Sequence, residues 1–247
     1  MILDPEKPEE QFELGVRYDN GIDIVQDLEL AAHWFRKAAE QGHAEAQFNL
    51  GCMYEDGQGV PVDYRESVRW FRKSAEQGVP RAQFELGRIY ETGLSTTDAL
   101  PFPLRFVAAL FVRPAVQKNV EEAVIWYRKS AEQGYTQAQF QLAYIYFSGG
   151  TGVPDFPEAV KWYRSAALQG HPASQYALAA CYHSGKGLPR SERNALAWWL
   201  VSSMGGNNDA AEMVEIMKGR VSKDEFEVCG IIAKSLQKTF TKHETGS

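Results

Sequence analysis

The sequence predicts an all-α solenoid of about five helix hairpins, each about 36 residues long, followed by a C-terminal capping helical unit. Three features recur at the same place in each hairpin: a tryptophan, a leucine followed by a small residue, and a set of turn and capping residues. The tryptophans are Trp34, Trp70, Trp126, Trp162 and Trp198, at intervals of 36, 56, 36 and 36 residues. The interval of 56 residues equals one period plus an insertion of 20 residues. A fixed period of this size is typical of repeat proteins.

The repeats follow one another in a single predicted solenoid domain, residues 1–238. Their approximate bounds are 8–43, 44–79, 80–135 with the insertion at 95–114, 136–171 and 172–207. A degenerate unit at 208–238 keeps helical periodicity but lacks the tryptophan, as expected of a terminal cap. The remaining segment, 239–247, is short and polar, and we expect it to be disordered.

The first helix of each repeat carries one apolar stripe. In the second repeat this stripe is Leu50, Gly51 and Tyr54, at positions i, i+1 and i+4. It recurs as Leu14/Gly15/Tyr18, Leu86/Gly87/Tyr90 and Leu178/Ala179/Tyr182. Because the residue after the leucine is small, we expect the second helix of the hairpin to approach closely at this point.

Glycines and capping residues mark the ends of the predicted helices. Glycines such as Gly57 and Gly185 end a first helix, because glycine tolerates the left-handed conformation of a C-terminal turn. Each second helix is expected to begin at a capping residue, and these are Asp27, Asp63, Asn119, Asp155 and Ser191. Each second helix is expected to stop at a glycine, and these are Gly42, Gly78, Gly134, Gly170 and Gly206.

The composition favours a soluble protein that binds neither nucleic acid nor anionic membranes. Hydrophobic residues make up 44% of the chain, enough for a continuous core, and charged residues make up 23%. The net charge is -6, whereas nucleic acids and anionic membranes attract clustered basic charge.

The cysteines and the start of the chain indicate the compartment. Cys52, Cys181 and Cys229 form no paired set, so they are expected to be buried or half-buried thiols rather than a disulfide framework. The opening MILDPEKPEE lacks the pattern of a signal peptide, and no apolar run is long enough to span a membrane. A cytoplasmic location is expected, or a periplasmic or secreted one if a signal peptide has been removed.

The repeated pattern AxAQ[FY]xLGxxYxxGxGVxxDxxxAxxWxxxAAxxG resembles the Sel-one-like repeat (SLR) family, a relative of the tetratricopeptide repeats. The resemblance extends from about Gln11 to Gly206 in five copies. It implies a right-handed α/α superhelix whose first helices line a concave groove. It also implies a bacterial adaptor or scaffold in protein complexes. One branch of the family links the helices of each repeat by a disulfide, and this chain lacks those paired cysteines.

If this groove assignment transfers, the first-helix positions that face the groove are two residues before the leucine and two, five and six residues after it. The row two residues before the leucine is Phe12, Phe48, Phe84, Phe140 and Tyr176. The row two residues after it is Val16, Cys52, Arg88, Tyr144 and Ala180. The row five residues after it is Asp19, Glu55, Glu91, Phe147 and His183. The groove would then be acidic in its N-terminal half and aromatic, with a histidine, in its C-terminal half.

These rows have two interpretations each. The aromatic row is either a ladder of anchors for a partner peptide or a set of rings that packs between helices and builds the groove wall. The variable rows either select a ligand with a basic segment followed by an apolar one, or form a solvated face.

The insertion, STTDALPFPLRFVAALFVRP, is too apolar for an idle loop. Its large apolar residues include Phe102, Phe106, Leu110 and Phe111. Exposed apolar surface of this kind marks interaction sites, so the segment could contact a partner. The alternatives are a local cover over its own repeat and, more weakly, a membrane-dipping element.

No catalytic, cofactor or metal motif is recognisable. The five histidines show no HExxH and no ligand spacing with cysteine, and His43 and His171 are interpreted as turn residues. The GxG turns recur with the structural period and no GK[ST] follows them, so they are not phosphate loops. We therefore expect no enzyme, no cofactor and no bound metal.

The sequence thus predicts a non-catalytic, monomeric adaptor that binds another protein or peptide on its concave face and through the insertion. The predicted partner-binding residues are Phe48, Glu55, Phe84, Arg88, Glu91, Phe140, Tyr144, Phe147, Tyr176, His183, Phe102, Phe106, Leu110 and Phe111. The alternative is a dedicated inhibitor or immunity protein that neutralises one toxin or enzyme. An enzyme of envelope or peptide chemistry and a self-assembling spacer are less favoured alternatives.

Overall fold

The structure is a computed structural model, and it describes residues 5–94 and 116–244. The whole insertion, with its predicted binding residues Phe102, Phe106, Leu110 and Phe111, lies outside the described residues. The chain forms two compact units, Met1–Gln133 (unit 1) and Gly134–Ser247 (unit 2). The expectation of one continuous solenoid domain stays a prediction.

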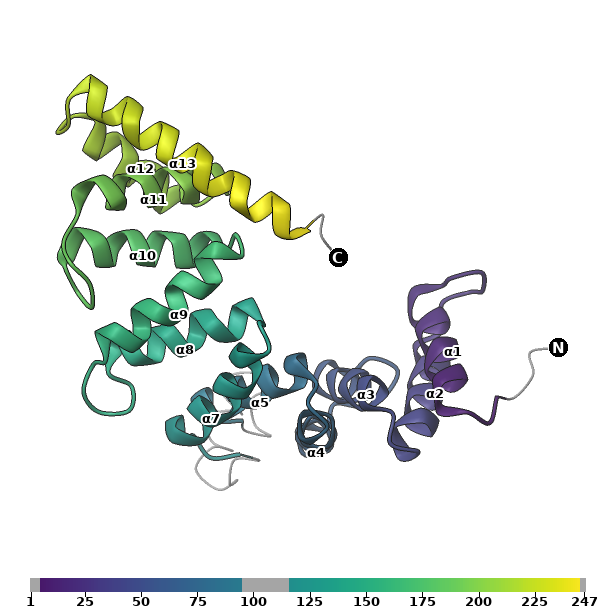
Figure 1. Ribbon diagram of the computed structural model, residues 1–247. Helices are drawn as coiled ribbons and strands as arrows, with labels where there is room; N and C mark the ends of the chain where they lie inside the picture. Colours follow the sequence, from purple (N-terminus) through teal and green to yellow (C-terminus); the bar gives the residue numbers. More distant parts are fainter. Residues whose placement is uncertain (1–4, 95–115, 245–247) are drawn as a thin grey trace, which may run out of the picture. The chain divides into compact units, whose positions relative to one another are not determined.

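The described residues of unit 1 form three helix hairpins (Figure 1). Their helices are α1 (Pro8–Asn20), α2 (Leu28–Glu40), α3 (Ala44–Asp56), α4 (Tyr64–Glu76), α5 (Pro80–Thr92) and α7 (Val120–Glu132). In each hairpin a first helix packs on a second one: α1 on α2, α3 on α4, and α5 on α7.

Unit 2 contains two further hairpins and a terminal pair of helices. These helices are α8 (Thr136–Ser148), α9 (Phe156–Leu168), α10 (Pro172–Ser184), α11 (Glu192–Met204), α12 (Asn208–Lys218) and α13 (Lys223–Glu244). Both α12 and the longer α13 pack on α11 (Figure 1). Because α13 runs to Glu244, residues 239–244 lie in a helix, whereas the sequence analysis assigned them to a disordered tail.

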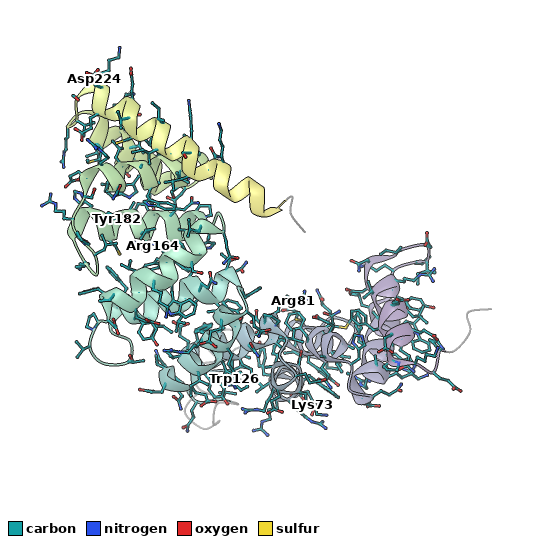
Figure 2. The ribbon with its side chains drawn as sticks, viewed as in Figure 1. Lys73, Arg81, Trp126, Arg164, Tyr182 and Asp224 are labelled. Atoms are coloured by element: carbon teal, nitrogen blue, oxygen red, sulfur yellow. The ribbon has the colours of Figure 1, made fainter. Side chains whose placement is uncertain are left out.

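The all-α solenoid architecture is confirmed. Within residues 5–94 and 116–244 there is no β-strand, only an isolated bridge between Leu94 and Val116. Neighbouring repeats are joined by a hydrogen bond from an arginine of one second helix to a tyrosine hydroxyl of the next first helix. Arg36 donates to Tyr54 at 2.8 Å in unit 1, and Arg164 donates to Tyr182 at 3.3 Å in unit 2, where both are labelled in Figure 2.

The five predicted capping residues begin the second helices. The side chain of each accepts a hydrogen bond from a backbone N–H in the first helical turn, as predicted. These residues are Asp27, Asp63, Asn119, Asp155 and Ser191. His43 and His171 also lie in turns, where their Nδ1 atoms accept from the backbone N–H groups of Ala46 and Ser174 and cap the following helices.

The small residue after the leucine permits the expected close helix approach. A Cβ atom added to Gly51 would lie 2.7 Å from the ring of Phe71, and one added to Gly87 would lie 2.5 Å from the ring of Tyr127. Unit 2 has a fully buried alanine, Ala143, at the equivalent position. The hairpins of the two units therefore pack at this point through different small residues.

Pairs of glutamines, which were not predicted from the sequence, form a ladder that holds every described hairpin except the last one at one end; the first-helix glutamine of each pair is buried. Gln47 donates to the carbonyl of Ala39 at 3.0 Å and accepts from Gln77 at 2.7 Å. The equivalent glutamine pairs are Gln11–Gln41, Gln83–Gln133 and Gln139–Gln169. The ladder ends at Gln175, because the partner position holds Gly205, and Oε1 of Gln175 is buried without a hydrogen-bond donor.

The hairpin that carries the insertion keeps the backbone hydrogen bond between its two helices that the uninterrupted repeat also has. Leu94 and Val116 exchange two backbone hydrogen bonds, at 2.9 and 3.0 Å, directly at its base. The N–H of Asn119 donates to the carbonyl of Tyr90, as Asp63 does to Tyr54 in the uninterrupted repeat. The described residues on either side of the insertion are therefore held together by the repeat itself.

Candidate functional site

An open pocket of about 340 Å³ lies in unit 2, between helices α8, α9 and α10 and the start of α12. Four of the predicted binding residues, Phe140, Tyr144, Phe147 and Tyr176, line it together. The other lining residues are Tyr163, Ala173, Ala177, Ala180, Asn207 and Asp209. We refer to this site as the aromatic pocket.

The helical period explains why these residues meet. Phe140, Tyr144 and Phe147 lie at i, i+4 and i+7 of α8, so they share one face of that helix. On α10 the pocket-lining positions are mostly alanines, which leave room in front of the α8 rings. Large side chains on one helix facing small ones on the next create a hollow rather than a closed interface.

Aromatic packing fixes the walls of the aromatic pocket. The ring of Tyr163 lies 5.9 Å from Phe140 and 6.2 Å from Phe147, measured between centroids. The ring of Phe147 also contacts Phe156, at 5.3 Å. Tyr163 is only 3% exposed, whereas Tyr144 is 52% exposed. The pocket thus has a buried, well-packed floor and one large aromatic side chain that is open to solvent.

The floor carries a polar group without a partner. The Tyr163 hydroxyl makes no hydrogen bond to a described residue, although its side chain is buried and lines the aromatic pocket. Burial raises the pKa of this hydroxyl above its ordinary value of 10.0, so the group stays protonated and can donate. The oxygen is not among the buried unpaired side-chain atoms of the described residues, so it reaches the open pocket and is available to a ligand.

Charged residues stand at the two ends of the aromatic pocket. Asp209 lies in the first turn of α12 and is exposed. The Lys186 ammonium lies beyond the other end, 5.2 Å from the ring centroids of both Phe147 and Phe156. No described residue forms an ion pair with either charge, so both are available for contact.

The corresponding face of unit 1 is charged and internally paired. Arg88 donates to Glu85 at 2.6 Å and to Glu55 at 2.5 Å. Burial opposes the charge of Arg88, but the hydrogen bonds and charges of the two glutamates raise its pKa. Glu91, another predicted groove residue, accepts a hydrogen bond from the Tyr127 hydroxyl at 2.7 Å. In the predicted acidic half of the groove, Arg88 therefore compensates part of the negative charge, and Glu91 already has a hydrogen-bond donor.

The aromatic row of unit 1 packs on its own hairpins. Phe48 lies 5.7 Å from Phe71, and Phe84 lies 5.6 Å from Tyr127, measured between ring centroids. The Arg81 guanidinium lies 4.7 Å from the ring centroid of Phe48 and also pairs with Glu45 at 2.6 Å. These rings thus pack within their hairpins, and both the groove-wall role and partner contact stay predictions.

His183 is separated from the other predicted residues of unit 2. Its Nδ1 atom lies 2.8 Å from Glu192, and its ring packs at 5.5 Å against Trp199. It lines a different, polar hollow of about 400 Å³ together with Arg190, Glu192, Met217, Arg220, Val221 and Glu225. The predicted groove residues of unit 2 are therefore divided between the aromatic pocket and this polar hollow.

Several residues of the aromatic pocket are absent from the sequence-based prediction. Tyr163 belongs to a second helix, whereas the predicted rows contain only first-helix positions. Its place in the repeat, directly after the recurring Trp162, was the available signal. Asp209 is one 36-residue period after the pocket residue Ala173, so extending the alignment into the cap could have identified it.

The described residues show no reactive or metal-binding cluster. No group of three or more His, Cys, Asp or Glu side chains within them could hold a metal ion. All three cysteines are free thiols, as expected, and burial raises the pKa of Cys52 to about 12 and that of Cys181 to about 11. Such thiols are protonated at neutral pH and are therefore poor nucleophiles. No helix in the described part of the chain is long and apolar enough to cross a membrane.

Comparison with known proteins identifies the repeats. The Sel1 repeat model matches at residues 11–43, 44–79, 80–99, 112–135, 136–171 and 172–207. The crystal structure of a Sel1 repeat protein from Oxalobacter formigenes is 30% identical in sequence, with a TM-score of 0.72, covering 95% of this chain and 85% of that one.

Two other solved structures are more distant. A protective antigen of uropathogenic Escherichia coli with an SLR fold is 26% identical, with a TM-score of 0.39, covering 98% of this chain and 64% of the antigen. An immunity protein from Pseudomonas aeruginosa is 18% identical, with a TM-score of 0.46, covering 98% of this chain and 83% of that protein. At these TM-scores neither similarity informs function. No curated protein sequence matches the chain. The repeat matches and the similarity to the Oxalobacter protein show that the chain belongs to the Sel1 repeat family.

Proposed function

We propose that this protein is a non-catalytic binding module that holds a segment of a partner protein in the aromatic pocket of unit 2. The observation that carries the proposal is the pocket itself, with four aromatic side chains on its walls, including the half-exposed Tyr144, and the buried Tyr163 in its floor. Sel1 repeat proteins are protein-interaction modules and are typically non-catalytic scaffolds, which supports the same class of function.

The physical basis is the low cost of ordering these side chains. The rings of Phe140 and Phe147 are already held by their contacts with Tyr163, so a partner does not have to immobilise them. Aromatic side chains also offer large apolar areas, and they are enriched among the residues that dominate binding energy. A partner's apolar side chain would therefore gain contact area at a small entropic cost.

The other predicted binding residues have lesser roles in this proposal. Phe48, Glu55, Phe84, Arg88 and Glu91 would form a separate contact surface on unit 1, and His183 would contribute from the polar hollow of unit 2. Because Arg88, Glu55 and Glu91 already have partners, a ligand would have to replace existing hydrogen bonds in order to use them. The dedicated-inhibitor alternative is motivated by the insertion, and it stays a prediction.

Site-specific cross-linking tests the proposal. A photo-reactive phenylalanine analogue is placed at Tyr144 or, as the control, at Ile125 of α7, which is 49% exposed and thus closely matched to the 52% of Tyr144. The protein is produced in its source cells, irradiated and analysed by mass spectrometry. We expect a specific cross-linked protein from position 144 alone, and its loss when Tyr176→Ala is added. Identical products from both positions, or none from position 144, would contradict the proposal.

A further inference from the structure

The two ends of the aromatic pocket differ in electrostatic sign. Asp209 is the second residue of α12, just as the pocket residue Ala173 is the second residue of α10, so the acid stands at the end where the first helices of the repeats begin. Glu212 follows at i+3, on the same side of α12, and is also exposed. These two carboxylates make this end of the pocket negative.

The other end is positive. Phe147 is near the end of α8, and Lys186 follows the last turn of α10, with its ammonium 5.2 Å from the Phe147 ring. Phe140 and Phe147 are seven residues apart on α8, which corresponds to about 10 Å along the helix axis. The pocket is therefore long enough to hold a few residues of an extended segment between its negative and positive ends.

The floor adds a directional group. In the third repeat, the Tyr127 hydroxyl donates to Glu91 of its own hairpin. In the fourth repeat the position of Glu91 is taken by Phe147, and the equivalent Tyr163 hydroxyl has no acceptor among the described residues. A backbone carbonyl of a bound segment would supply the acceptor that the chain itself lacks.

We infer that the aromatic pocket recognises a peptide segment in which an apolar side chain is flanked by a lysine or arginine. The apolar side chain packs among Phe140, Tyr144, Phe147 and Tyr176, and the cation pairs with Asp209. A carbonyl of the segment accepts from Tyr163. Lys186 disfavours a second cation at the far end, which fixes the direction of the segment. This inference rests on the proposed function and specifies the chemistry of its partner.

The test uses a displayed library of random twelve-residue peptides and the purified full-length protein, so no natural partner is needed. Peptides are selected on the wild type, on Asp209→Lys and on a matched control, Asp224→Lys. Asp224 is also an exposed acid in the first turn of a unit 2 helix, so its reversal has a similar effect on the helix dipole (Figure 2). Thermal unfolding of each variant, followed by circular dichroism, verifies that the fold is retained.

We expect the wild type and Asp224→Lys to enrich an apolar residue next to Lys or Arg. Selection on Asp209→Lys should lose the cation or replace it by an acid. The dissociation constant of a wild-type-selected peptide should rise by about tenfold in Asp209→Lys, more than a screened surface pair alone gives, because the variant adds repulsion. In Tyr163→Phe it should rise by about threefold to tenfold, through the lost hydrogen bond.

Two results would overturn the inference and leave the proposed function standing. They are apolar peptides without a preferred charge on the wild type, and a cation preference that survives in Asp209→Lys, provided that Tyr144→Ala abolishes binding in either case. If selected peptides bind Tyr144→Ala as tightly as the wild type, the aromatic pocket is not the binding site, and the proposed function and the inference are both wrong.

Discussion

The predicted groove residues of units 1 and 2 occupy the same repeat positions, but those of unit 1 are charged and paired with one another, whereas those of unit 2 are aromatic and line an open pocket. In unit 1, Arg88 donates hydrogen bonds to Glu55 and Glu85, so these charged side chains have partners within the unit. In unit 2 the positions equivalent to Arg88 and Glu91 hold Tyr144 and Phe147, and an open aromatic pocket results. The difference shows that one scaffold produces either a closed wall or an open site, depending on whether its variable residues can pair with each other.

Tyr127 and Tyr163 are the clearest single pair in this comparison. Both are nearly fully buried, and burial raises the pKa of both hydroxyls. Glu91 accepts from Tyr127 at 2.7 Å, whereas no described residue accepts from Tyr163. One substitution along the repeat, glutamate to phenylalanine, thus changes a structural hydrogen bond into an available donor.

The largest expected effect concerns the small residue after the leucine, which is glycine in unit 1 and alanine in unit 2. We expect Gly87→Ala to lower the free energy of unfolding by about 1–3 kcal/mol, because the new methyl group would overpack the helix contact. Its Cβ would lie 2.5 Å from the buried ring of Tyr127. Denaturant unfolding measures the change.

The control for this prediction is Gly230→Ala in α13, where an added Cβ meets nothing within 4 Å. Alanine should be neutral or stabilising there, because it favours the helix over glycine. Equal destabilisation by both variants would show that the close approach at Gly87 is not the cause.

The next effect tests the tyrosine pair directly. Tyr127→Phe should lower the free energy of unfolding by about 1–2 kcal/mol, since it removes a hydrogen bond to the charged Glu91. Tyr163→Phe should change it little, because no described residue pairs with that hydroxyl. Parallel urea titrations of the two variants give the comparison, and similar losses in both would remove the proposed distinction between the two hairpins.

The glutamine ladder offers a stabilising change in unit 2. The backbone of Gly205, with φ -81° and ψ 6°, matches that of Gln77, with φ -82° and ψ 0°. Gly205→Gln should therefore supply a donor to Gln175 and raise the free energy of unfolding by about 1 kcal/mol. Gly205→Ala separates this gain from the loss of glycine flexibility alone. A glutamine variant no more stable than the alanine variant would contradict the ladder interpretation.

The smallest effect is a pH dependence at the start of α10. Burial lowers the pKa of His171 below 6.5, and its neutral Nδ1 accepts from the N–H of Ser174. This contribution is complete above pH 6.5 and is lost as the pH falls through the lowered folded-state pKa, because protonation favours the unfolded chain. The loss should be below about 1 kcal/mol, the usual worth of one cap.

Melting temperatures between pH 7.5 and pH 4.5 measure this effect. His171→Asn keeps a capping side chain that does not titrate, so its melting temperature should fall less than that of the wild type across this range. Parallel curves for the two proteins would exclude His171 as a source of the pH dependence.

The sequence by itself determined the helical hairpins and the residues at which their helices begin and end. The capping residues, the stop glycines and the glycine after the leucine were all identified correctly, because each acts within about one helical turn or at a position that the period repeats. The same regularity indicated that Phe140, Tyr144 and Phe147 share one face of α8, since that follows from helix geometry alone.

Only the tertiary structure decided which of these residues form a site. Arg88 meets Glu55, which is 33 positions earlier in the chain, and the ladder joins glutamines 30 positions apart. Tyr163 and Asp209 enter the aromatic pocket from a second helix and from the cap, while His183 turns instead toward Glu192. These outcomes depend on side-chain direction and on spacing between helices, and a repeat period specifies neither.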